Sequence, residues 1–360
     1  MSRFLAKKNS GLVPYVPGEQ PKFGEFIKLN TNESPFPPSP AALEILKSAD
    51  AARLNLYSDM EVTQLVDAIS YFYKIPAEQI TVGNGSDEIL AFCFMAFCSD
   101  GEKGVGACYP DISYGFYKVY AQLFGLETKV VPLRDDFSID IGDFFGAGKT
   151  IFIANPNAPT GICLSLSQIE EFLRRNHDNI VVIDEAYVDF GGESCVSLIK
   201  KYDNLVVVQT FSKARNMAGA RIGFAMAQKP LIDDLKLIKY SFHPYNVNTL
   251  SHLAGAAAMR DTDYFRECTA KVISARGWTK SELEQRGFVC TDSKANFIFA
   301  MHPNFPGKAL YEKLKEKKIL IRRFDAPRIN NHVRISIGTK EQMAALVAAI
   351  DEIFCEGGII

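Results

Sequence analysis

Lys213 is the residue whose type and position first suggest chemistry in this sequence. It follows Ser212, a few residues after the apolar run Leu205–Val208, which is typical of a buried strand. A lysine so close to a buried strand end is uncommon, because an unpaired ammonium is costly to bury. One explanation is an amine that desolvation makes nucleophilic and that forms a Schiff base. The alternative is a solvated loop lysine.

Two further charged residues lie near strand ends. Asp184 ends the apolar run Ile180–Ile183, and Arg221 lies eight residues after Lys213. A carboxylate at such a position can pair with a protonated ring nitrogen, although a helix N-cap or a magnesium ligand would also suit it. The planar guanidinium of Arg221 can bind a phosphate.

A glycine-containing turn supplies a fourth candidate. Gly83-Asn84-Gly85-Ser86-Asp87-Glu88 follows one predicted strand and opens a helix, where free backbone N–H groups attract phosphate. The dinucleotide fingerprint needs a small residue at Glu88, so a single phosphate fits better. The alternative is a plain turn in which Ser86 or Asp87 caps the helix. A lysine, an acid and a phosphate cup together suggest pyridoxal phosphate.

The elements that must position these residues alternate along the chain. Short apolar runs at 80–82, 105–108, 128–132, 151–154, 180–183, 205–208 and 222–227 alternate with helical patterns at 87–98, 112–124 and 166–175. This alternation predicts an α/β fold with a mostly parallel sheet covered by helices on both faces. Loops that follow parallel strands share one edge of the sheet. We therefore expect Gly83–Glu88, Asn155–Gly161, Asp184–Tyr187 and Ser212–Arg221 to meet there.

The pattern changes after about residue 245. Long helical patterns at 249–259, 264–285, 308–317 and 341–354 enclose short strand-like runs at 288–290, 297–299, 319–321 and 333–337. We predict an N-terminal arm over residues 1–40, a large domain over 41–245 and a smaller α+β domain over 246–360.

Composition excludes several classes of protein. The 360 residues carry a net charge of −2, unlike most nucleic-acid binders, and the longest apolar run, Ile89–Cys98, has ten residues where a membrane span needs about 20. Eight cysteines form no Cys-x-x-Cys pair, and the five histidines lack metal-ligand spacing. These features predict a cytoplasmic protein with reduced thiols and no metal site.

The whole chain resembles the fold-type-I aminotransferases, a family that uses pyridoxal phosphate. The resemblance rests on Gly85–Glu88, Ile183–Tyr187, Thr210–Ala214 and Ala218–Arg221, and on Val333–Thr339 near the C-terminus. Two further stretches, Leu29–Pro35 and Pro244–Asn248, are more specific for the histidinol-phosphate branch of the family. The resemblance implies a large domain with a mostly parallel seven-stranded sheet.

The resemblance also implies roles for individual residues. Lys213 would bind the cofactor covalently and shuttle a proton, Asp184 would hold the pyridine nitrogen protonated, and Tyr187 would donate to the ring O3′. Tyr114 would stack on the ring. The cofactor phosphate would be held by Gly85, Ser86, Asp87, Ser212 and Arg221, and by Tyr57 of a partner subunit, which implies a homodimer.

On the substrate side, the resemblance implies one anion site for two substrates. It would accept both histidinol phosphate and glutamate, or 2-oxoglutarate in the reverse direction, because an arginine fork pairs with phosphate and with carboxylate. Arg322 and Arg334 match anion-binding positions, and Tyr15 and Asn32 match substrate contacts. Alternation points Arg323 to the other face, where a surface ion pair is expected.

The sequence departs from the family at two points, and it leaves several alternatives open. Ser58 stands where the family usually has a proline after the tyrosine at position 57. Ala158 stands where the family has an Asn that binds O3′; Asn157 could take that role, or Tyr187 could act alone. Within the same fold, an aromatic amino-acid aminotransferase or a threonine-phosphate decarboxylase remains an alternative. A nucleotide-binding sensor or a dehydrogenase is the alternative from another class.

Overall fold

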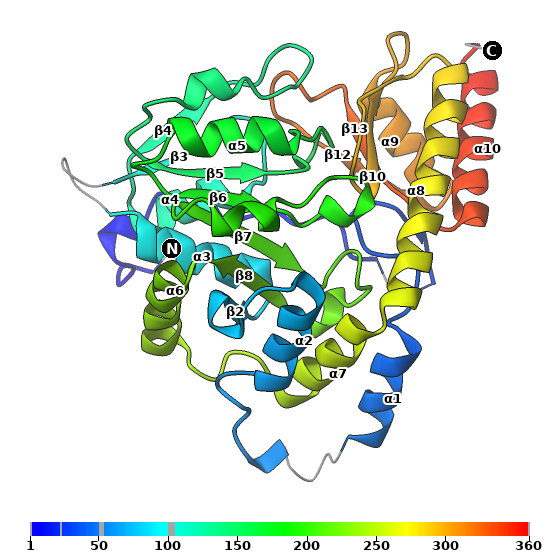
Figure 1. Ribbon diagram of the computed structural model, residues 1–360. Helices are drawn as coiled ribbons and strands as arrows, with labels where there is room; N and C mark the ends of the chain where they lie inside the picture. The colour runs from blue at the N-terminus through cyan, green and yellow to red at the C-terminus, as the bar shows by residue number, and fades with distance from the viewer. Residues whose placement is uncertain (1, 22–23, 50–53, 100–104, 359–360) are drawn as a thin grey trace.

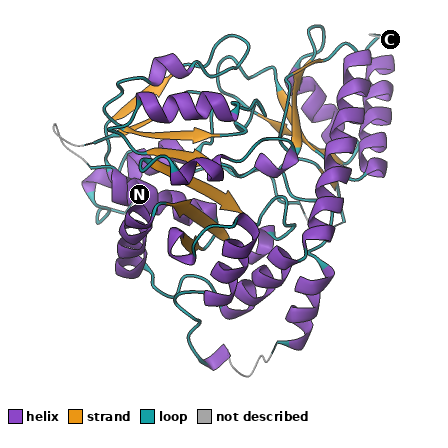
Figure 2. Cartoon of the chain, viewed as in Figure 1, coloured by secondary structure: helices purple, strands orange, loops and turns teal. Residues whose placement is uncertain are grey.

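The computed structural model describes residues 2–21, 24–49, 54–99 and 105–358, so the outermost ends of the predicted arm and C-terminal domain, residues 1 and 359–360, lie outside it. Its strands gather in two separate regions of the molecule, with helices packed around both (Figures 1 and 2). Among the described residues, no helix is long and apolar enough to cross a membrane.

The larger sheet has seven strands in the order β2-β8-β7-β6-β5-β3-β4. They are β2 (Ile80–Gly83), β3 (Ala107–Pro110), β4 (Thr128–Val131), β5 (Thr150–Ala154), β6 (Val181–Asp184), β7 (Leu205–Thr210) and β8 (Gly223–Ala227). Only β8 runs antiparallel to its neighbours, so the predicted mostly parallel sheet is confirmed. Strand β3 begins two residues later than its apolar run suggests, because its pairing with β4 and β5 sets its limits.

Helices cover both faces of this sheet. They are α1 (Pro40–Ser48), α2 (Thr63–Tyr73), α3 (Ser86–Phe97), α4 (Phe116–Phe124), α5 (Leu166–Arg175), α6 (Lys229–Phe242) and α7 (Thr249–Arg260). Alternation along β5 sends Ile151 and Ile153 to the core under α1, α2, α5 and α7, and Phe152 to the core under α3, α4 and α6. The strands are therefore buried on both sides, as their continuous apolar runs predict.

The second sheet belongs to the C-terminal part of the chain. Its order is β12-β13-β10-β9, all antiparallel, formed by β9 (Val289–Cys290), β10 (Phe297–Met301), β12 (Arg322–Arg323) and β13 (Val333–Ser336). Helices α8 (Thr262–Gln285), α9 (Gly307–Glu316) and α10 (Lys340–Glu356) pack around it, and Figure 1 shows α8 and α10 side by side. Short 3₁₀ helices occur at Lys7–Asn9, Ala77–Gln79, Ile141–Phe144, Val188–Phe190, Cys195–Lys200 and Ala218–Ala220.

The N-terminal arm joins the C-terminal part through a two-stranded parallel sheet. Strand β1 (Ile27–Lys28) pairs with β11 (Ile319–Leu320). The carboxylate of Glu19 accepts a hydrogen bond from Lys315 Nζ at 2.6 Å and one from the Tyr311 hydroxyl. These contacts place the arm on the C-terminal part of the same chain.

Helix α7 bears on the predicted boundary at residue 245. Its buried side chains, among them Ala254 and Met259, pack in the core beneath the seven-stranded sheet, against α1 and α2. This packing supports a grouping of residues 246–260 with the large domain, which we offer as a proposal. We propose that the division falls within α8, where Val272 and Leu283 enter the C-terminal core.

Candidate active site

A cavity of about 610 Å³ lies at the edge of the seven-stranded sheet where the parallel strands end. All four predicted loops contribute to its wall, together with the arm and the strands β12 and β13, so the expectation that these loops meet is confirmed. The lining includes twelve of the predicted site residues: Tyr15, Asn32, Ser86, Asp87, Tyr114, Asp184, Tyr187, Ser212, Lys213, Arg221, Arg322 and Arg334.

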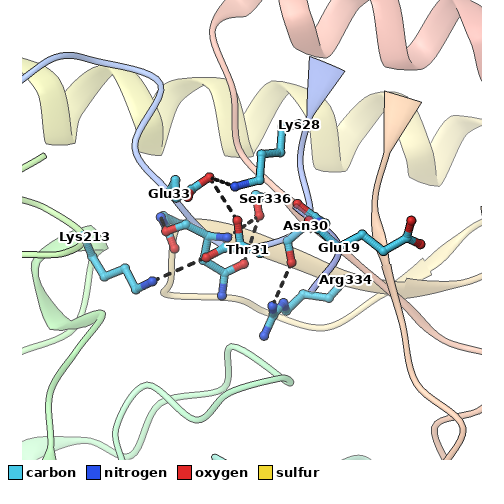
Figure 3. Close-up of polar contacts among 10 residues, drawn as sticks. Glu19, Lys28, Asn30, Thr31, Glu33, Lys213, Arg334 and Ser336 are labelled. Atoms are coloured by element: carbon cyan, nitrogen blue, oxygen red, sulfur yellow. Dashed lines mark hydrogen bonds and ion pairs between the residues drawn. The ribbon is translucent and has the colours of Figure 1, made fainter. Parts of the chain in front are cut away.

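Lys213 points into the cavity from the loop after β7. Its Nζ has one long contact, 3.5 Å to the carbonyl oxygen of Thr31, and it lies 5.7 Å from the centre of the Tyr187 ring. Figure 3 shows Lys213 and Arg334 pointing toward the arm segment at Asn30 and Thr31 from different elements. The amine is half-buried, and within the described part of the chain it forms no ion pair with a carboxylate, an arrangement that leaves it available for chemistry.

Asp184 is a buried carboxylate at the end of β6. Its oxygens accept hydrogen bonds from the Tyr117 hydroxyl at 3.0 Å and from the Ala186 backbone N–H at 3.2 Å. Burial raises the pKa of Asp184 to about 7, and the two hydrogen bonds only partly offset that effect. A carboxylate in this condition favours a cationic partner, and the protonated nitrogen of a pyridine ring fits that need.

The start of α3 forms an anion cup beside Lys213. No side chain caps this helix, because its N-cap residue is Gly85, so neither Ser86 nor Asp87 plays the alternative N-cap role. A Cβ at Gly85 would lie 2.5 Å from Arg221 Nη2, and Gly85 has a φ of +85°. The positive φ favours glycine there, and a Cβ would also displace the guanidinium from its present position.

The carboxylate of Asp87, at the start of α3, is engaged by two neighbouring side chains. It accepts hydrogen bonds from the Tyr114 hydroxyl at 2.6 Å and from Arg221 Nη2 at 3.0 Å. A carboxylate does not donate hydrogen bonds, so it cannot bind a phosphate directly. Asp87 suits an anion through its backbone N–H and through the orientation of Arg221.

Asn32 links the N-terminal arm to Tyr187, which follows β6, and to Ser336 on β13. It has a φ of +55° and is almost fully buried. Its Nδ2 donates to the Tyr187 hydroxyl at 3.0 Å, and its Oδ1 accepts from Ser336 Oγ at 3.0 Å. Its backbone N–H donates to the same Ser336 oxygen at 2.8 Å, and its carbonyl accepts from Asn296. Asn32 thus orients Tyr187.

Arg322 and Arg334 face each other directly across β12 and β13. Arg322 donates to the carbonyl oxygens of Val16 and Pro17 at 3.0 Å each, whereas Arg334 has one hydrogen bond among the described residues, to the Asn30 carbonyl at 3.2 Å. The Nε of Arg334 is buried and has no hydrogen-bond partner in the part of the chain that the structure describes, and burial lowers the pKa of this arginine. Like charges directly opposite each other are unfavourable unless an anion joins them.

Arg323 turns away from the cavity. Its guanidinium pairs with Asp325 at 2.6 Å, and it is absent from the cavity lining. The predicted surface ion pair is therefore confirmed, and the alternation along β12 explains it.

Two tyrosines form an aromatic wall. Tyr15 of the arm stacks on Phe116 with ring centres 4.5 Å apart and lies 6.3 Å from Tyr114. Burial raises the pKa of Tyr15 and of Tyr114, so both hydroxyls stay protonated and can donate hydrogen bonds. Tyr114 lines the cavity, and an aromatic side chain there suits stacking on a planar ligand.

Three predicted residues do not line this cavity. Gly85 lies beneath Arg221. Asn157 donates from its Nδ2 to the Ile112 carbonyl and to the Thr160 hydroxyl, both at 3.0 Å, and is not among the lining residues. Tyr57 is 83% exposed and stacks on Tyr245 at 4.5 Å, away from the cavity of its own chain.

The sequence interpretation missed several residues of the site. Tyr117, which donates to Asp184, lies in the first turn of α4, three residues after Tyr114, in the same aromatic segment that the sequence analysis singled out. The arm backbone at Asn30 and Thr31 offered no such signal. Within the described ranges, no cluster of three potential ligands could hold a metal ion.

Comparison with known proteins identifies the class. Residues 24–350 match the family model for aminotransferase class I and II. The chain therefore belongs to the class I and II aminotransferases.

Its relatives within this class point to one branch. The chain is 52% identical over 351 residues to a histidinol-phosphate aminotransferase from Brachyspira hyodysenteriae, an alignment that covers 97% of this chain and 98% of that protein. A histidinol-phosphate aminotransferase from Clostridium botulinum is 48% identical over 353 residues, covering 98% and 99%. The crystal structure of histidinol-phosphate aminotransferase from Sinorhizobium meliloti in complex with pyridoxal-5'-phosphate has a TM-score of 0.83 at 23% identity, with 91% of each chain covered. That likeness shows the fold.

Proposed function

We propose that this protein is a pyridoxal-phosphate-dependent aminotransferase that exchanges an amino group between L-histidinol phosphate and 2-oxoglutarate, giving imidazole-acetol phosphate and glutamate in histidine biosynthesis. The observation that carries the proposal is one cavity lined by the amine of Lys213 and the buried carboxyl group of Asp184. The same cavity is lined by Arg221 near the start of α3, and by the arginine pair Arg322 and Arg334 on β12 and β13. The relatives at 52% and 48% identity support the choice of substrate.

The residues present fit pyridoxal phosphate. When bound, this cofactor supplies a carbonyl for the amine and a ring that accepts electrons. Lys213 would hold it covalently and then move the proton at the substrate α-carbon. Asp184, a carboxylate whose pKa burial raises, would keep the ring nitrogen protonated. The uncapped start of α3 and Arg221 would hold the phosphate.

Tyr187 would donate to the phenolic oxygen of the cofactor. Its hydroxyl already accepts from Asn32 Nδ2, so its own proton is free to point into the cavity. Since Asn157 is engaged elsewhere, we propose that Tyr187 acts without an asparagine partner at this oxygen.

Arg334 and Arg322 would bind the anionic end of either substrate. The Nε of Arg334 is a buried donor without a hydrogen-bond partner among the described residues, and Arg334 lines the cavity, so an acceptor on the substrate would satisfy it. A phosphate of histidinol phosphate and a carboxylate of glutamate both accept two parallel hydrogen bonds from such a fork. Tyr15, which lies in the same wall, would contact the substrate.

We further propose a cytoplasmic homodimer. Tyr57 lies outside its own cavity and is largely exposed, as are the neighbouring apolar side chains Leu54 and Leu56. A second copy would cover this surface and receive Tyr57 at its cofactor phosphate. All eight cysteines are free thiols, which suits a reducing compartment.

The first test concerns Lys213. Lys213→Ala should abolish turnover, because no other amine would hold the cofactor or move the proton. Borohydride reduction of the wild-type holoenzyme should link the cofactor to Lys213, as peptide mass spectrometry would reveal. Full activity of the variant, or labelling of another lysine, would contradict the assignment.

A second test compares substrates. Steady-state rates with histidinol phosphate, phenylalanine and threonine phosphate should favour histidinol phosphate with 2-oxoglutarate as acceptor. A preference for phenylalanine would identify an aromatic aminotransferase. Release of carbon dioxide from threonine phosphate without a keto acid would identify a decarboxylase.

A further inference from the structure

Arg328 joins the C-terminal part of the chain to the large sheet at the rim of the cavity. Its Nη1 donates to Asp111 Oδ2 at 3.0 Å, and its Nη2 donates to the carbonyl oxygens of Leu133 at 2.9 Å and Arg134 at 2.8 Å. Asp111 follows β3, and Leu133 follows β4. One guanidinium therefore holds the ends of two strands of the large sheet.

The segment that carries Arg328 connects the two strands of the anion site. Residues 324–332 link β12, which holds Arg322, to β13, which holds Arg334. Arg328 has a φ of +69°, an unfavourable backbone conformation for a side chain other than glycine. Strain of this kind persists only where the surrounding contacts enforce it, and it concentrates at functional sites.

The rim around this contact is part of the cavity wall. Asp111 and Ile112 line it from the large domain, and Phe324 and Ile329 line it from the connecting segment. A separate small core of Ile112, Leu133, Phe299 and Ile329 lies across the same junction. Asp111 Oδ1 also accepts the backbone N–H groups of Ile112 and Leu133 at 2.8 and 2.9 Å, which makes it a fixed anchor.

We propose that Arg328 is a positioning residue that docks the tip of the β12–β13 hairpin on Asp111, and so fixes where the cavity holds the anionic end of a substrate relative to Lys213. The inference rests on the proposed function, because it assumes that Arg322 and Arg334 bind that anion. Arg328 also compensates the charge of Asp111, a carboxylate in a cavity that must accept anions.

The experiment compares Arg328→Ala with Arg323→Ala in the holoenzyme. The control removes an arginine of the same hairpin that pairs with Asp325 outside the cavity. Arg328→Ala should raise KM for histidinol phosphate and for 2-oxoglutarate roughly tenfold to a hundredfold, since small misplacements of a binding group have effects of that size. Arg323→Ala should change both by less than about twofold.

Further variants distinguish docking from simple charge or stability. Arg328→Lys retains the charge but cannot reach three acceptors, so it should restore little of the loss. Asp111→Asn retains an acceptor for the backbone N–H groups. When Asp111→Asn is combined with Arg328→Ala, the KM should rise little beyond that of Arg328→Ala alone. The reason is that Arg328→Ala has already removed the contact between Arg328 and Asp111. Cofactor affinity, measured by absorbance titration, should stay unchanged in Arg328→Ala.

Two outcomes would overturn the proposal. One is a KM within about twofold of the wild type for both substrates in Arg328→Ala. The other is a loss of cofactor affinity and of thermal stability that accompanies the KM change, which would indicate a general folding role. Failure of the proposed function is a separate result, because the wild-type enzyme itself would then not turn over histidinol phosphate.

Discussion

At the scale of single residues, the burial of Asp184 should make the stability of the cofactor-free protein depend on pH. Burial raises its pKa from 3.8 to about 7 in the protein without cofactor. Between these values the folded state binds the proton that the unfolded state releases. The free energy of unfolding therefore falls as pH rises from about 4 to 7, and Asp184 destabilises the cofactor-free protein most above pH 7.

Asp184→Asn tests this effect. Between pH 5 and pH 8, the cofactor-free wild type should lose on the order of 2 kcal/mol more stability than the variant. Urea unfolding at both pH values measures the difference, and the variant corrects for all other groups. The holoenzyme should show a smaller loss, because a protonated ring nitrogen would favour the ionised carboxylate. Equal pH slopes for both cofactor-free proteins would argue that Asp184 is already ionised at pH 5.

Arg334 carries a second prediction at this scale. Its buried, unpartnered Nε makes it the more available half of the arginine pair, since Arg322 already holds the arm. Arg334→Ala should lower kcat/KM roughly tenfold to a hundredfold in both half-reactions, from a charge-assisted contact of about 1.5–3 kcal/mol. Single-turnover kinetics with histidinol phosphate and with glutamate measure this.

Arg334→Lys provides the matched comparison. A lysine keeps the charge without the planar fork, so it should recover only part of the loss. If Arg334→Ala affected one substrate and spared the other, the two substrates would not share one anion site.

At the scale of elements, the start of α3 depends on Gly85. Gly85→Ala would bring a methyl group to 2.5 Å from Arg221 Nη2 at a φ of +85°. The guanidinium would have to move, so cofactor affinity should fall at least about tenfold, given that a charge-assisted contact is worth about 1.5–3 kcal/mol. Equilibrium dialysis of cofactor with the variant measures the change.

Gly125→Ala is the control for backbone strain. Gly125 ends α4 with a φ of +69°, and a Cβ there would meet no atom within 4 Å. This variant should lose about 1–2 kcal/mol of stability and keep its cofactor affinity. Equal affinities of the Gly85 and Gly125 variants would remove Arg221 from the cofactor site.

At the scale of the whole molecule, the position of Tyr57 predicts sites shared between subunits. Lys213→Ala dimers should be inactive, and Tyr57→Phe dimers should bind cofactor more weakly through the lost hydroxyl. A hybrid dimer with one change on each subunit would contain one intact site, which pairs the unchanged Lys213 with the unchanged Tyr57. Purified hybrids with two different tags should therefore regain the cofactor affinity and turnover of that site.

The matched hybrid places both changes on one subunit beside a wild-type subunit. Its only lysine-bearing site would receive the altered Tyr57, so it should behave like the Tyr57→Phe enzyme. If this hybrid matched the wild type instead, Tyr57 would act in its own chain or not at all.

The sequence by itself determined the chemistry near the strand ends. Lys213, Asp184 and the turn at Gly85 are local signals, because each follows a short apolar run and parallel strands end at one edge. Alternation along β12 also placed Arg322 and Arg323 on opposite faces correctly.

Only the tertiary structure decided which distant residues complete the site. Asn32 meets Tyr187 and Ser336, and Arg328 meets Asp111, across separations of more than a hundred residues. It also packed α7 into the core beneath the seven-stranded sheet and engaged the Asn157 amide with Ile112 and Thr160. The periodicity of a sequence indicates on which side of its helix or strand a side chain lies. The hydrogen-bond partner of a polar side chain depends instead on how distant helices and strands pack together, and no local sequence pattern encodes this packing.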